Sequence, residues 1–88
     1  MKITPVNARS YSASAQLQAT YKGKQRQIVA NILRASKEPL TPEQIAPLAE
    51  SMGLTAVGGV LPSVRYHLHH LVLLGHAEWT APAVEAAA

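Results

Sequence analysis

Two consecutive helical segments, each with a recognisable start and end, constrain the fold of this chain more than any other feature of its sequence. Residues 41–44 (Thr-Pro-Glu-Gln) predict the start of a helix. Thr41 and Gln44 can form a capping box, in which their side chains accept hydrogen bonds from free backbone N–H groups, and Pro42 suits the first helical position. Apolar residues then recur at helical spacing until Gly53, which favours a left-handed helix end. A second helical pattern covers residues 62–74 and stops at Gly75. The sequence therefore predicts two helices joined by a turn over residues 55–61.

The rest of the chain predicts a third helix and little else that is regular. Residues 24–36 carry a broad apolar stripe at helical spacing. Residues 14–21 are rich in helix formers, but Gly23 weakens their continuity with the helix predicted over residues 24–36. They are therefore expected to form either a short separate helix or a frayed extension of that helix. Residues 1–13 show no sustained period and are expected to be irregular, whereas residues 77–80 (Ala-Glu-Trp-Thr) predict a short strand. The expected fold class is mainly α with a minor β part.

Length and composition limit the size and class of the protein. With 88 residues there is room for one domain, and dimerisation would help its stability. We expect a flexible basic arm over residues 1–21, helical at most in part, a folded domain over residues 22–80, and a C-terminal tail or the remnant of a wing over residues 81–88. The absence of Cys excludes disulfides, thiolate zinc sites and cysteine nucleophiles. Without an apolar run of about 20 residues or a signal-peptide pattern, we expect a cytoplasmic protein that does not enter the membrane.

Charge is distributed unevenly along the chain. Residues 1–37 contain seven of the eight Lys and Arg residues and no acid, which gives this part a formal charge of +7. Residues 38–88 contain Arg65 and all five Glu residues, for a formal charge of −4. Such asymmetry favours either a basic surface for a polyanion or a solvated basic tail, and composition does not separate the two.

The helix over residues 62–74 has an outward face without acids. Its core stripe leaves Tyr66, His69, His70 and Leu73 pointing the other way. No acid occurs between Ser51 and Ala77, which suits an approach to phosphate. Arg65 is the one Lys or Arg on this helix; it would contact guanine or a phosphate, or else pair with a nearby Glu.

These residues resemble a known family. From about Lys24 to Trp79 the chain is similar to a winged helix-turn-helix domain of the bacterial repressor type, most of all to ArsR-like and MarR-like regulators. The similarity is densest over residues 63–75, in the His-Leu pair, the Leu three residues later and the closing Gly. The resemblance implies a three-helix winged helix-turn-helix fold in which helix 62–74 enters the major groove of DNA. The segment after Gly75 would begin a short or degenerate wing.

We therefore predict sequence-specific binding of double-stranded DNA by a small transcriptional regulator, a repressor in the simplest case. The side chains expected to contact DNA are Lys22, Lys24, Arg26, Thr41, Thr55, Ser63, Arg65, Tyr66, His69 and His70. A homodimer would read two half-sites. Leu17, Tyr21, Leu73 and Leu74 are apolar residues expected on a partner surface. The alternative is a winged-helix protein-interaction module that binds a protein partner, such as a subunit of the transcription machinery.

Enzymatic and metal chemistry are not predicted. The chain has no Gly-rich phosphate loop, no pairing of a nucleophile with a base and too few residues to enclose a pocket, so no cofactor is expected. His67 and His70 are three residues apart, but no further ligand follows at a typical metal-binding spacing. We expect no metal site and a half-buried structural role for His67. A metal- or pH-responsive switch built on the four His residues is a weaker third hypothesis.

Overall fold

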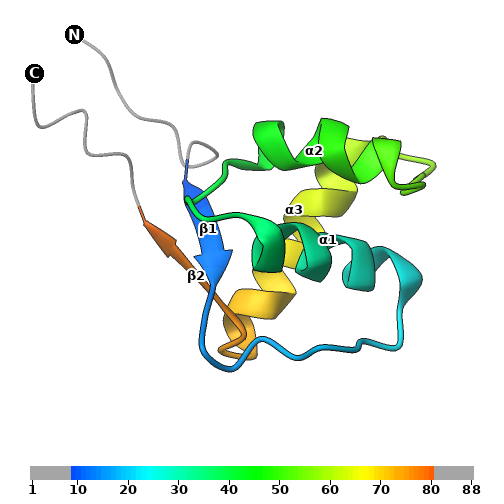
Figure 1. Cartoon of the computed structure of the whole chain (residues 1–88). Helices are drawn as coiled ribbons and strands as arrows, with labels where there is room; N and C mark the ends of the chain where they lie inside the picture. Colours follow the sequence, from blue (N-terminus) through cyan, green and yellow to red (C-terminus); the bar gives the residue numbers. More distant parts are fainter. Residues whose placement is uncertain (1–8, 81–88) are drawn as a thin grey trace, which may run out of the picture.

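The computed structural model describes residues 9–80, which form three helices and a two-stranded sheet. Along the chain these elements are β1 (Ser10–Ala13), α1 (Lys24–Ala35), α2 (Pro42–Ser51), α3 (Val60–Leu73) and β2 (Ala77–Thr80). Figure 1 shows the sheet on one side of the three helices, with α3 behind α1 and α2. The coarse prediction of a small α+β fold with three helices is confirmed. The first eight residues of the expected arm and the expected tail over residues 81–88 lie outside the described residues.

The sheet joins the two ends of the described chain. β1 and β2 are antiparallel, and Ser10 pairs with Thr80 at the end where both strands leave the domain. On its other side, β1 forms a single bridge from Tyr11 to Leu40, with N–O distances of 2.7 and 2.9 Å. The prediction of irregular chain over residues 10–13 was wrong, because these backbone groups pair with residues far away in the sequence. Within the described residues, β2 pairs with the N-terminal strand and not with a hairpin that follows α3.

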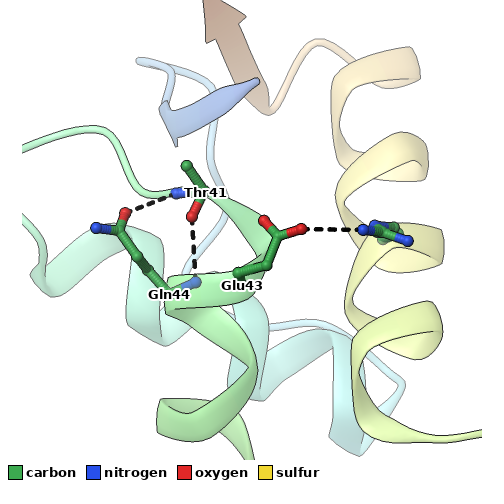
Figure 2. A network of polar contacts seen from close by, with 4 residues as sticks. Thr41, Glu43 and Gln44 are labelled. Carbon is green, nitrogen blue, oxygen red and sulfur yellow. Dashed lines mark hydrogen bonds and ion pairs between the residues drawn. The ribbon is translucent and has the colours of Figure 1, made fainter. Parts of the chain in front are cut away.

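The helix boundaries follow the predicted signals closely. Thr41 caps α2 through a complete capping box, in which the Gln44 N–H donates to Thr41 Oγ1 at 3.2 Å and the Thr41 N–H donates to Gln44 Oε1 at 2.9 Å (Figure 2). Gly53 and Gly75 end their helices with φ of 101° and 80°. α3 begins two residues before the predicted start, because Gly59 provides the entry with φ of 105°. Pro62 fits in the first turn, because the backbone N–H groups there have no acceptor within the helix and the missing N–H of Pro costs no hydrogen bond.

The segment between β1 and α1 is not helical, which corrects the prediction for residues 14–21. Side chains of α1 hold its backbone: Gln27 Oε1 accepts from the Tyr21 N–H at 2.6 Å, and Arg34 Nη2 donates to the Gln18 carbonyl at 2.6 Å. These bonds satisfy backbone groups that a helix would satisfy internally. Leu17 and Tyr21 are half-buried and pack against the core in this arrangement, which leaves less of their apolar surface for a partner than the sequence indicated.

One apolar core connects the three helices and β2. Its fully buried members include Val29 and Leu33 of α1, Ile45 of α2, and Leu68 and Leu71 of α3. The predicted core stripe of α3 is thus confirmed for these two residues. Among residues 9–80, no polar or charged side chain is fully buried. No helix in this part of the chain is long and apolar enough to cross a membrane.

Candidate nucleic-acid interface

α3 presents an outward stripe between two flanks that belong to different helices. The N-terminal turn of α2 contacts one flank through Glu43, which reaches Arg65. The N-terminal turn of α1 contacts the other flank through Gln25 and Arg26, which reach Ser63 and His67 respectively. The α3 surface is therefore framed by the starts of both other helices, of which α1 has no side-chain cap for its free backbone N–H groups.

The outward stripe consists of aromatic, imidazole and aliphatic side chains. Tyr66 is 57% exposed and Leu73 is 68% exposed, and His69 is exposed beside the half-buried His70. The Tyr66 and His70 rings lie 4.4 Å apart between centroids, and the two His rings lie 5.8 Å apart. Among residues 9–80, the side-chain polar atoms of Tyr66, His69 and His70 make no hydrogen bond, whereas their backbone groups serve the helix. These side-chain donors and acceptors are therefore available to a ligand.

The α2 flank carries an ion pair. Arg65 Nη2 lies 3.0 Å from Glu43 Oε2, and the two side chains are 40% and 49% exposed (Figure 2). Pairing with a nearby Glu was one of the alternatives that the sequence left open for Arg65. Because α3 contains no acid, Glu43 of α2 supplies the carboxylate beside this surface. Exposed pairs of this kind contribute only about 0.2–1 kcal/mol. A phosphate can therefore compete with Glu43 for the guanidinium.

The α1 flank carries a hydrogen-bond network centred on Gln25. Its Oε1 accepts from Ser63 Oγ at 3.1 Å and lies 3.4 Å from His67 Nε2, while its Nε2 donates to the Thr55 carbonyl. Arg26 Nε donates to His67 Nδ1 at 3.2 Å. A neutral imidazole that accepts at Nδ1 carries its proton on Nε2, so the second ring nitrogen donates to Gln25. His67 is half-buried, as predicted.

The environment of His67 favours its neutral form. Burial lowers the pKa of this imidazole below the ordinary 6.5, and electrostatic interactions with Arg26 and with His70 lower it further. At neutral pH the ring is therefore an uncharged member of the network.

The ten candidate residues fall into two groups. The exposed ones are Lys22, Lys24, Thr55, Tyr66 and His69. The half-buried ones are Arg26, Thr41, Ser63, Arg65 and His70. Among the second group, the fold already uses polar atoms of four: Thr41 in the α2 cap, Ser63 with Gln25, Arg26 with His67 and Arg65 with Glu43. The candidate residues placed to serve a ligand without rearrangement are thus Lys22, Lys24, Thr55 and the α3 residues Tyr66, His69 and His70.

Sequence reasoning missed the partners in these contacts. Gln25 and Glu43 are polar residues in the first turns of their helices, and nothing in the local sequence pairs them with residues 38 and 22 positions away. Of the four His residues, His67 is held by Arg26, and His76 Nδ1 lies 2.8 Å from the Tyr21 hydroxyl. Over residues 9–80, no group of three His, Cys, Asp or Glu side chains is arranged to hold a metal ion.

A second surface feature lies away from the α3 stripe. An open groove of about 410 Å³ separates the C-terminal parts of α1 and α2 and contains no residue of α3. Its apolar lining includes Ile32, Leu40, Leu48 and Met52, of which Leu48 and Met52 are 45% and 47% exposed. This groove differs in chemistry from the α3 stripe because it offers few polar groups.

Comparison with known proteins provides no relative for this chain: no protein family, no curated protein and no solved structure matches it. Its function must therefore be inferred from its own residues.

Proposed function

We propose that this protein binds double-stranded DNA sequence-specifically, as a small helix-turn-helix transcriptional regulator of the repressor type related to winged-helix proteins. The observation that carries the proposal is the exposed stripe of α3, whose donors and acceptors are unused and whose helix contains no acid. α2, the turn over residues 52–59 and α3 supply the supporting helix and the reading helix of this motif.

The dimensions of α3 suit a major groove. Its 14 residues extend over about 21 Å, and the groove is about 12 Å wide, enough for one helix. Tyr66 and His69 would meet base edges as hydrogen-bonding groups. The stripe would thus supply the sequence-dependent part of recognition.

Basic residues beside the stripe would hold the DNA backbone. Lys22 and Lys24 are exposed just before and at the start of α1, close in the sequence to Arg26, which contacts His67. Arg65 would exchange its weak exposed contact with Glu43 for a phosphate or a guanine edge. These contacts would make binding dependent on salt.

A homodimer would place two such helices on two half-sites. Leu73 and Leu74, at the end of α3, are 68% and 55% exposed, which supports an apolar contact with a second copy. Sedimentation of the protein alone and with duplex DNA would measure the mass of the particle and thereby test whether it is a dimer.

A salt series of duplex binding tests the proposal. Wild-type protein should bind random duplex DNA with an affinity that falls steeply between about 50 and 200 mM salt. Lys22→Ala combined with Lys24→Ala should reduce the slope of log K against log salt by about 2. Glu50→Gln, an exposed change on α2, serves as the control and should leave the slope unchanged. Absence of binding at low salt would overturn the proposal.

The apolar groove supports a second candidate function. Leu48 and Met52 are large, exposed and adjacent to Ile32 and Leu40, the kind of surface that receives an apolar segment of a protein partner. Under this alternative the protein is an interaction module, and Leu48→Ser with Met52→Ser would abolish binding of its partner. The same double variant should leave DNA binding unchanged if the first proposal holds.

A further inference from the structure

His67 and Arg26 form a contact that depends on the charge state of the imidazole. Arg26 Nε donates to His67 Nδ1 at 3.2 Å, and the opposite ring nitrogen faces Gln25 Oε1 at 3.4 Å. The first bond needs an unprotonated Nδ1, because an imidazolium has N–H groups on both nitrogens and no acceptor. Protonation of His67 therefore removes the bond and places two positive groups within contact distance.

We propose that neutral His67 holds the Arg26 guanidinium against α3 and that protonated His67 releases it to the basic surface formed by Lys22 and Lys24. In the released state, Arg26 is a third phosphate-binding group, and the charge of this flank rises by one through the imidazolium itself. Arg26 is thereby converted from a bridge between α1 and α3 into a contact for an anionic ligand. This consequence for DNA rests on the proposed function, whereas the release of Arg26 does not.

The surroundings of His67 contain no acid that would oppose this release. From α1, Arg26 is the charged group that faces the ring, and Gln25 is neutral. From α3 itself, the Tyr66 ring lies 5.2 Å away in an edge contact, and His70 adds a further positive influence. Glu43, the acid that contacts α3 in the described part of the chain, pairs with Arg65 on the opposite flank. An imidazolium at position 67 thus meets only neutral or positive neighbours, which agrees with the lowered pKa of this residue.

NMR of the free protein tests the release directly. The side-chain nitrogens of His67 and the Nε–H group of Arg26 are followed from about pH 7.5 to pH 5, the range over which histidines titrate. We expect both signals to change with the same midpoint, below 6.5, and the Arg26 Nε–H to exchange faster with water at the acidic end. In Arg26→Gln, the midpoint of His67 should rise toward 6.5. An Arg26 signal that does not follow the His67 titration would overturn the proposal.

Matched Asn variants test the consequence for DNA. His67→Asn keeps an oxygen close to the position of Nδ1 and does not titrate. His76→Asn removes a histidine that lies outside the α3 stripe, where its Nδ1 contacts the Tyr21 hydroxyl. Wild type and His76→Asn should show a slope of log K against log salt that steepens by about 1–2 between pH 7.5 and 5.5. His67→Asn should lose most of this increment. An increment of equal size in His67→Asn would contradict the role of Arg26 in binding. Absence of DNA binding in all three would overturn the proposed function, and the NMR titration would then decide by itself whether Arg26 is released.

Discussion

At the scale of single residues, the polar contacts of α3 determine which groups remain available to a ligand. Glu43 restrains Arg65 through a pair that is nearly half exposed on both sides. We expect Glu43→Gln to tighten DNA binding, because it frees the guanidinium and removes a negative charge beside the α3 stripe. Its cost in the free energy of unfolding should be below about 1 kcal/mol. Fluorescence anisotropy and urea unfolding measure the two effects.

The matched control for this prediction is Glu50→Gln, which removes the same charge from an exposed position on α2. Equal tightening by the two variants would mean that net charge alone is responsible, and the specific role of the Glu43–Arg65 pair would then be wrong.

A second prediction at this scale concerns the pH dependence of stability. The pKa of His67 is lowered in the folded state, so the unfolded chain takes up a proton near pH 6.5 while the folded protein remains unprotonated. The contribution of His67 to stability is therefore complete above pH 6.5, falls as the pH drops below this value, and levels off below the folded pKa. Urea unfolding at several pH values should show that His67→Asn reduces this decrease, whereas His69→Asn should not. A decrease of equal size in wild type and His67→Asn would contradict the prediction.

At the scale of elements, the start of α3 depends on a backbone conformation that favours glycine. Gly59 has φ of 105° and ψ of 153°, a region that residues with a side chain rarely occupy. We expect Gly59→Ala to lower the free energy of unfolding by about 1–3 kcal/mol. Gly58→Ala, the neighbouring change, adds a methyl group in open space without a positive φ and should be neutral or slightly stabilising. Thermal unfolding of both variants checks the contrast, and equal losses would show that the turn tolerates no side chain at either position.

Local signals in the sequence were sufficient for the helices and insufficient for the sheet. The cap at Thr41, the ends at Gly53 and Gly75, and the strand over residues 77–80 follow from patterns confined to a few neighbouring residues. β1 (Ser-Tyr-Ser-Ala) has no such pattern, since its pairing partners are Leu40 and β2, far along the chain. The Glu43–Arg65 and Arg26–His67 contacts were not predictable for the same reason. The spacing of apolar residues shows which side of a helix faces outward, but it does not show which residues of a neighbouring helix lie beside that side.

At the scale of the whole molecule, the N-terminal strand closes the domain. Figure 1 shows β1 beside β2. On its other side β1 bridges to Leu40, and Tyr11 packs against the core. We expect deletion of residues 1–13 to lower the unfolding temperature clearly relative to deletion of residues 1–8, which leaves every described residue in place. The helical circular dichroism signal during heating measures this difference. Equal unfolding temperatures for the two truncations would mean that β1 does not contribute to stability.

The central claim is that the α3 stripe and the start of α1 form a DNA-binding surface. Backbone amide NMR spectra recorded during addition of a short random DNA duplex at low salt test this claim most directly, because they report each residue separately. We predict that the changes concentrate at Lys22–Arg26 and at residues 62–70, while the groove residues Leu48 and Met52 remain unaffected. Spectra that do not change with DNA, or changes confined to the groove, would contradict the account.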